Sequence, residues 1–471
     1  MREATPAQTL AEATADRVYD AVAGEEEDRA CDAIPDEACD EVPGNFLLNA
    51  LNGASTKLAE QLASPGLVLP WMLGAVGAPS VLVGFLVPVR RAGALLPQLV
   101  IAGRIRAFAR RKWFWVGAGV GQAVSLLLMV PALLLLPPLG AGLAVVGLLA
   151  LFSMASGVGS VAFKDVTAKT IPKGRRGRLL GVRATVGGFL ALGGALALRR
   201  FVGEEDSLAP YFGLLVAASA LWVLGALFFA GIREMRGATE GGRNALDEAQ
   251  AGLGLLREEP AFARFVLARA FLLAAQLAAP FYALQAQGLT GVGSGNLAIL
   301  IMASSLAAIL SSPFWGRFSD ASARRVMVAG GIWTGTTVAL ALGGGFLPES
   351  VTASEVGMGP ITPGIALFAL VFLSSGFAES GVRLGRKTYL LDGAPELKRP
   401  LMVAVANTLV GIMYAASAAL GLLAGWVGVP VVLLVLGGMA VAGTVMAWRL
   451  PEAEGLMASP GAPTRAGSPQ E

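Results

Sequence analysis

The stretch GRIRAFARRK at residues 103–112 is repeated 213 positions later as GRFSDASARR at residues 316–325. The two copies align without a gap, and the matching pairs are Gly103/Gly316, Arg104/Arg317, Arg111/Arg324 and Lys112/Arg325. A weaker repeat, Lys169-Thr170 and Lys387-Thr388, has an offset of 218. The sequence therefore predicts two halves of about 215 residues in the same orientation, built on one plan.

The composition excludes a soluble protein. Hydrophobic residues make up 55% of the 471 residues and charged residues 15%, whereas soluble domains carry ~25% charged residues. Such a chain cannot supply the polar surface that a soluble fold needs, so we expect an all-α polytopic membrane protein. Histidine is absent, and Cys31 and Cys39 are interpreted as free thiols. We therefore expect no metal site and no cofactor.

Long uncharged runs predict nine transmembrane spans directly, at ~20 residues for each helix, and residues 179–200, apolar apart from Arg183 and the terminal Arg199 and Arg200, give a tenth. The runs 113–163, 270–316 and 400–448 each hold two spans, and they break at 137–140, 288–295 and 425–430. Single spans are predicted at 179–200, 207–232, 326–348 and 356–378.

Residues 45–102 must supply two more spans, although they contain Lys57, Glu60, Arg90 and Arg91. The span at 295–315 directly precedes Gly316, so the repeat places a span at 80–102 directly before Gly103. This puts Arg90 and Arg91 at mid-membrane and leaves 45–74 as the first span. The prediction is twelve helices in two six-helix repeats.

Lysine and arginine are absent from the odd-numbered turns between these spans and frequent in the even-numbered turns. By the positive-inside rule, both termini and every even turn are cytosolic in a cytoplasmic (inner) membrane. The basic cluster from Pro172 to Arg178 is interpreted as a contact with anionic lipid headgroups, and no nucleic acid partner is expected.

The predicted domain organisation follows from these spans. Residues 1–44 form a disordered acidic tail with 13 acids and 3 arginines, and the rest of the chain is net +13. Two six-helix bundles are predicted at 45–232 and 263–450, and residues 451–471 form a flexible cytosolic tail. The linker 233–262 is predicted to hold an amphipathic helix, whose apolar face is Leu246, Ala249, Leu253 and Leu256.

Gly316, Asp320, Arg324 and Arg325 match four positions of the pattern G-x-x-x-D-[RK]-x-G-R-[RK]. Through this motif and its repeat, the chain resembles the major facilitator superfamily over residues 45–450. The first copy keeps Gly103, Arg111 and Lys112 but has Ala107 in place of the aspartate. The resemblance implies two bundles that rock about a central cavity. The carboxylate of Asp320 can pair with Arg324 and hold the cytosolic gate closed; alternatively, Arg317, Arg324 and Arg325 only set the topology. The R-x-x-x-G motif of proton-coupled members is missing from the fourth span, and the fifth span has no Gly-Pro pair.

Ionisable groups inside the spans mark candidate substrate or coupling residues, because each costs ~2.5–3.5 kcal/mol at mid-bilayer unless it has a partner or water. They are Lys57, Glu60, Arg90, Arg91, Arg269, Glu379 and Arg383. Lys57 and Glu60 are three residues apart, so they can pair on one helix face. Alternatively, Lys57–Glu60 and Glu379–Arg383 are self-contained packing pairs, and Arg269 and Arg383 extend to the cytosolic surface.

These residues leave three excess positive charges inside the spans, which favours an anionic or zwitterionic substrate. The leading hypothesis is a monomeric secondary transporter for a small solute, with efflux and proton coupling through Glu60 or Glu379 left open. The alternative is a non-transporting receptor or assembly factor on the same scaffold. No enzyme is expected, because no HExxH, GxSxG or Walker motif occurs.

Overall fold

The computed structural model describes residues 41–202, 208–237, 239, 254–291, 293–319, 322–346, 362–395 and 398–453. Within these ranges the chain is helical and contains no β-strand. The amphipathic face predicted in the linker falls largely outside the described residues. The described end of the linker, residues 254–258, is helical, and the buried Leu255 packs in one cluster with Phe262 and Phe265.

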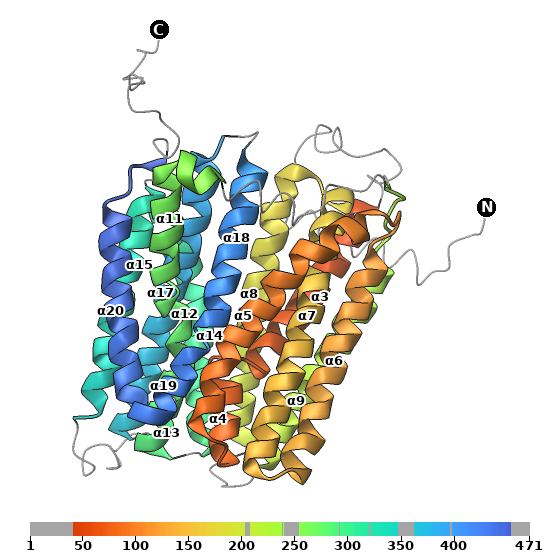
Figure 1. Cartoon of the computed structure of the whole chain (residues 1–471). Helices are drawn as coiled ribbons and strands as arrows, with labels where there is room; N and C mark the ends of the chain where they lie inside the picture. The colour runs from red at the N-terminus through yellow and green to blue at the C-terminus, as the bar shows by residue number, and fades with distance from the viewer. Residues whose placement is uncertain are drawn as a thin grey trace.

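The first half of the chain forms one group of helices, and the second half forms another. The first group is α3 (Val42–Leu62), α4 (Val68–Ala75), α5 (Ser80–Arg106), α6 (Lys112–Leu135), α7 (Pro138–Thr170), α8 (Lys173–Val202) and α9 (Ala209–Gly231). The second group is α11 (Pro260–Phe271), α12 (Ala274–Leu277), α13 (Ala279–Thr290), α14 (Ser294–Ser319), α15 (Ala323–Gly344), α17 (Pro363–Gly393), α18 (Arg399–Ala416), α19 (Ala419–Val427) and α20 (Val429–Trp448). The two groups stand side by side (Figure 1).

Eleven helical stretches of the described chain are long and apolar enough to cross a membrane. The three helices α11, α12 and α13 form one of these stretches, and α18 and α19 form another. The segment α3 and α4 takes the place of the first predicted span. It breaks after Leu62, where Pro65 cannot donate a backbone hydrogen bond, and the hydroxyl of Ser64 accepts from the amide of Val68 at 3.3 Å. This confirms the predicted all-α polytopic fold in two repeats.

The span predicted at 80–102 by the repeat is correct, because α5 runs from Ser80 to Arg106 and carries Arg90 and Arg91 near its middle. Two other predicted boundaries are wrong. Helix α7 continues to Thr170 and α17 continues to Gly393, so Lys169, Arg386 and Lys387 lie in helices and not in turns. Long basic side chains can remain helical there because their charged ends reach water or a polar partner.

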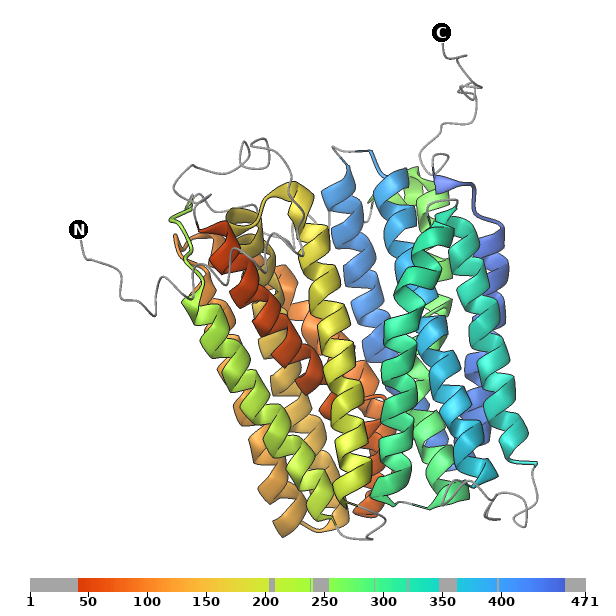
Figure 2. The ribbon, with the colours of Figure 1, turned by 180° about the vertical axis from the view of Figure 1, so that it is seen from behind.

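Contacts between the two groups follow the repeat. Helix α5 packs on α18 and α19, and its counterpart in the second half, α14, packs on α8 (Figure 2). At one point the α5 and α19 backbones nearly touch, because a Cβ on Gly84 would lie 2.2 Å from the Cα of Gly421. Nearby, the side-chain amide of Gln287 on α13 donates to the carbonyl of Trp71 on α4 at 2.7 Å. These contacts hold the halves together at one end of the bundle.

The opposite end of the bundle is the one where α3 begins and α20 ends, at the top of Figure 1. It carries Arg104, Arg111, Lys169, Arg178 and Arg325, and we call it the basic end. The close contacts of Gly84 with Gly421 and of Gln287 with Trp71 therefore lie at the end away from these basic residues.

We expect the basic end to face the cytosol, because lysine and arginine are retained on that side during insertion. A reporter fused after residue 240 should be active as a cytosolic enzyme and inactive as a periplasmic one. A fusion within the turn 137–142 serves as the control and should give the opposite pattern. Periplasmic activity after residue 240 would contradict the orientation.

Candidate functional site

Helices α3 and α5 bring three of the predicted residues together. The ammonium of Lys57 lies 2.7 Å from one carboxylate oxygen of Glu60, which confirms the predicted pair. The guanidinium of Arg90 lies 3.5 Å from the other oxygen, and it also lies over the ring of Phe152 at 5.1 Å. Glu60 thus has two cationic partners, so the pair inferred from the sequence is a three-residue cluster.

Arg91, the next residue on α5, crosses to the other half. Its guanidinium lies 3.1 Å from the carboxylate of Glu379 on α17. The self-contained Glu379–Arg383 pair considered above is therefore wrong. Arg383 instead donates to the hydroxyl of Ser380 at 3.4 Å, one turn back on its own helix. The Arg91–Glu379 ion pair ties the two halves together at the centre of the bundle.

Arg269 on α11 is buried, with 8% of its surface exposed. It donates to the side-chain oxygen of Asn407 on α18 at 2.9 Å. The alternative that Arg269 extends to the cytosolic surface is wrong, because its side chain is buried and contacts Asn407 within the second half. Farther along, the hydroxyl of Tyr414 donates to the side-chain oxygen of Gln276. Both contacts join the seventh span to the eleventh.

One buried cation of the first half was not among the predicted site residues. Arg183 on α8 donates to Asn49 and to the side-chain oxygen of Asn52, the latter at 2.9 Å. Its guanidinium also lies over the ring of Phe163 at 4.6 Å. The sequence does contain a signal for this residue, because Arg183 is the one charge inside the otherwise apolar run before Arg199. Its hydrogen-bond partners are neutral, and the Glu60 carboxylate lies within electrostatic range.

Three further cations between the two halves were also missed, Arg386 and Lys387 on α17 and Lys164 on α7. Lys387 on α17 lies within electrostatic range of Arg383 and Arg386 on its own helix, and of Lys57 and Lys164 on the other half. No carboxylate of the described residues forms an ion pair with Arg383, Arg386, Lys387 or Lys164. The sequence did not identify these residues, because Lys387 was placed in a turn and Lys164 just after the predicted run 113–163. Both lie on helices that are longer than predicted.

The predicted gate residues of the first half form a network at the basic end. The buried carboxylate of Glu234, which follows α9, accepts from the backbone amides of Arg111 and Lys112 at 2.8 Å each. It also pairs with Lys169 at 2.9 Å, while the side chain of Arg111 pairs with Asp165. Glu234 therefore stabilises the N-terminus of α6, where the helix dipole favours a negative charge.

The second half repeats this arrangement around Glu452, 218 positions after Glu234. Arg324 lies 2.7 Å from Glu452, and Ser322 donates to the same carboxylate at 2.8 Å. The hydroxyl of Ser322 caps α15 by accepting from the amide of Arg325 at 3.2 Å. The predicted Asp320–Arg324 pair lies outside the described residues. Gly103 and Gly316 lie in the last turns of α5 and α14.

Solved transporters share this architecture of two groups of membrane-spanning helices. The chain resembles a mutant of the nucleoside transporter NupG, with a TM-score of 0.62 and 12% identity over 86% of this chain and 99% of that one. It resembles a D-xylose–proton symporter with a TM-score of 0.60 and 16% identity over 87% and 98%. It also resembles the inward-open xylose transporter XylE from E. coli, with a TM-score of 0.59 and 15% identity over 87% and 97%. At these identities the likeness is one of fold.

Residues 290–468 match the family model of the Major Facilitator Superfamily. The match covers part of the second half, and the solved transporters share the fold over 86–87% of the chain, so the predicted resemblance to the major facilitator superfamily is confirmed. Uncharacterized proteins of Mycobacterium tuberculosis (Rv2209) and Mycobacterium bovis (Mb2232) are 26% identical over 286 residues. This match covers 59% of the chain and about half, 54%, of each relative's length.

Glu234 and Glu452 provide a matched test of the basic-end networks. Replacing Glu234 by alanine should destabilise the protein by roughly 3–5 kcal/mol, because it leaves Lys169 without a carboxylate partner and two helix-terminal amides without an acceptor. Glu452→Ala should cost about 0–1 kcal/mol, because that side chain is 48% exposed. Thermal unfolding of both variants in detergent measures the difference. Equal losses would contradict a special role for the buried carboxylate.

The Arg91–Glu379 ion pair should hold the halves in the arrangement seen here. Glu379→Gln removes that contact and should broaden the distance between spin labels at Arg178 and Arg325, measured by pulsed electron paramagnetic resonance after Cys31 and Cys39 are replaced by serine. Arg91→Glu combined with Glu379→Arg re-forms an ion pair and should restore the narrow distribution. A single variant with wild-type distances would show that the pair does not constrain the halves.

Proposed function

We propose that the protein is a secondary transporter that moves a small anionic solute across the cytoplasmic membrane by alternating access. The observation that carries the proposal is the uncompensated positive charge at the centre of the bundle. Arg383, Lys387 and Lys164 have no carboxylate partner among the described residues, and they lie where the two halves meet. Carrying such charge into a membrane is costly unless a counter-ion or water occupies the site.

The moving parts in this proposal are the two bundles 45–232 and 263–450, joined by the linker 233–262. Contacts near Gly84 and Gly421 close one end, while the central cations Arg383 and Lys387 are exposed. This combination supports an arrangement in which the substrate enters from the basic end, which we assign to the cytosol. Gly103, Gly316, Asp320 and Arg325 then belong to the cytosolic gate, and anionic lipid headgroups contact the basic turns.

The charged centre also offers a coupling device. Glu60 and Glu379 each accept from cations, so protonation of either carboxylate would release a cation to the substrate. We propose proton coupling through one of these two residues as the finer form of the transport mechanism. The arrangement of Glu379 favours it for this role, because its partner Arg91 lies in the other half and the release would separate the halves.

A ligand screen tests the charge of the substrate. We expect organic anions such as succinate and citrate to raise the unfolding temperature of the purified protein, and xylose and uridine to have no effect. Binding stabilises the folded state by about 2.7 kcal/mol when the ligand is present at ~100 times its dissociation constant. Stabilisation by neutral solutes alone would contradict the proposal.

Flux separates a transporter from the alternative, a receptor or assembly factor on the same scaffold. A stabilising anion should enter liposomes that contain the protein, and this uptake should saturate with concentration. Liposomes without protein are the control. Binding without uptake would favour the receptor.

A further inference from the structure

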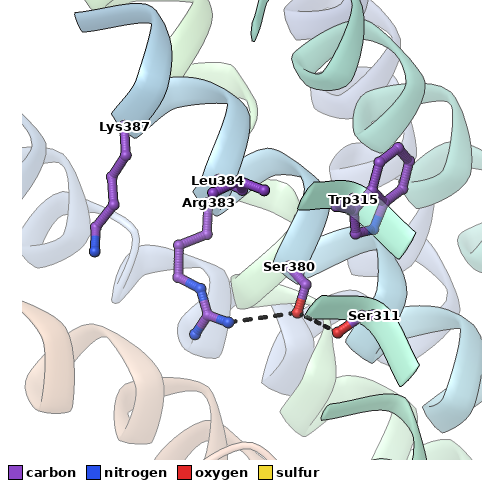
Figure 3. A pocket seen from close by; sticks show the side chains of 6 residues that line it. All are labelled: Ser311, Trp315, Ser380, Arg383, Leu384 and Lys387. Atoms are coloured by element: carbon purple, nitrogen blue, oxygen red, sulfur yellow. Dashed lines mark hydrogen bonds between the residues drawn. The ribbon is translucent and has the colours of Figure 1, made fainter. Parts of the chain in front are cut away.

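A pocket of about 100 Å³ lies between α14 and α17 on the second half (Figure 3). Ser311, Trp315, Ser380, Arg383, Leu384 and Lys387 line it. Four of these residues lie at positions i, i+3, i+4 and i+7 of α17, so they share one face of that helix. Gly381 lets the wall form, because a Cβ there would lie 2.7 Å from the Trp315 ring. The pocket is therefore shaped by close packing on its apolar side.

The polar side of the pocket has hydrogen-bond donors that are available to a ligand. The hydroxyl of Ser311 donates to Ser380 at 2.9 Å, and the guanidinium of Arg383 donates to the same hydroxyl at 3.4 Å. The oxygen of Ser380 thus accepts twice, which leaves its own proton free to donate. Arg383 makes this single weak contact with a neutral partner, so most of its five N–H groups are also available.

Positive charge from both halves converges on this pocket. Lys387 interacts electrostatically with Arg383, Arg386, Lys57 and Lys164, and all four neighbours are cations. A single monoanion would leave this group strongly positive. A compact dianion would offset two of the charges at one point, whereas the two carboxylates of a longer dianion would each offset one charge at separate points.

Lys57 can turn to such a ligand at low cost. Its partner Glu60 lies between two cations, Lys57 at 2.7 Å and Arg90 at 3.5 Å. If Lys57 leaves, Arg90 still compensates Glu60. The side chain of Lys57 is 49% exposed, whereas that of Arg90 is 16% exposed and lies over Phe152. Lys57 is therefore the exchangeable partner, and Arg90 is the fixed one.

We propose that the pocket binds a compact dianionic group, of the kind carried by phosphate monoesters and sulfate. Arg383, Lys387 and Ser380 hold it from the second half, and Lys57 leaves Glu60 to close on it from the first. This inference rests on the proposed function and specifies its substrate class. Because the ligand contacts both halves, its binding favours a state in which the halves are closed around the pocket.

Sulfate and methanesulfonate make a sharp test, because they share a tetrahedral oxyanion and differ by one charge. Calorimetric titration of the purified protein, with sodium salts at equal ionic strength in a chloride background, should give at least about tenfold tighter binding of sulfate. Arg383→Gln and Lys387→Gln should each weaken sulfate binding roughly tenfold, the loss of one charge-assisted hydrogen bond. Arg264→Gln, an exposed arginine on α11, is the matched control and should bind as the wild type.

Lys57→Gln checks the exchange of partners. It should weaken sulfate binding while Arg90 keeps Glu60 compensated, so the unfolding temperature without sulfate should change little. The unfolding temperatures of Arg383→Gln and Lys387→Gln without ligand show whether these variants fold. Loss of sulfate binding in a folded variant supports the proposal.

Equal affinity for sulfate and methanesulfonate, or no effect of Arg383→Gln and Lys387→Gln on sulfate binding, would overturn the proposal. Succinate separates this failure from failure of the proposed function. If succinate binds and is transported while sulfate does not bind, the dianion site is wrong and anion transport stands. If no anion binds and neutral solutes do, both are wrong.

Discussion

The cost of placing charge inside a membrane governs the centre of this protein. Every ionisable side chain there must have a partner, a hydrogen-bonding dipole or water. Glu60 and Glu379 each form an ion pair with an arginine of α5, while Arg269 and Arg183 donate to asparagine side chains. Both carboxylates then have cationic partners, and several other cations remain without an ion pair. The excess positive charge is therefore a property of the assembled bundle and not of one helix.

The contacts of the two halves are equivalent at the basic end and differ at the centre. At the basic end Glu234 and Glu452 occupy equivalent positions and each ties the turn after the second span of its half to the end of the sixth. Such contacts stay within one half and leave the halves free to move. At the centre the symmetry is lost, since Glu60 pairs within the first half and Glu379 pairs across to Arg91. Because of this asymmetry, the Arg91–Glu379 ion pair forms only when the two halves are close together at the centre.

Much of the fold could be predicted from the sequence, because span length and charge in the turns are local properties. The repeat placed α5 correctly where hydropathy alone would have ended a span at Arg90. The lengths of α7 and α17 were underestimated, because Lys164 and Lys387 resemble turn charges when the chain is read in one dimension. The Lys57–Glu60 pair was predictable from a spacing of three residues. The Arg91–Glu379 pair was not, because it joins residues 288 positions apart on different halves.

Helix geometry explains why some of the central cations pair with carboxylates and others do not. Arg90 and Arg91 are neighbours on α5, about 100° apart around the helix, so one can face α3 while the other faces α17. Each then pairs with a carboxylate, Lys57 shares Glu60 with Arg90, and Lys387 and Arg383 form no ion pair with a carboxylate of the described residues. A site that must both bind and release an ion benefits from such a division, because a cation already held by a buried carboxylate offers a ligand little. The long, flexible side chains of Lys57 and Lys387 can follow a solute as the halves move, while the arginines keep the carboxylates compensated.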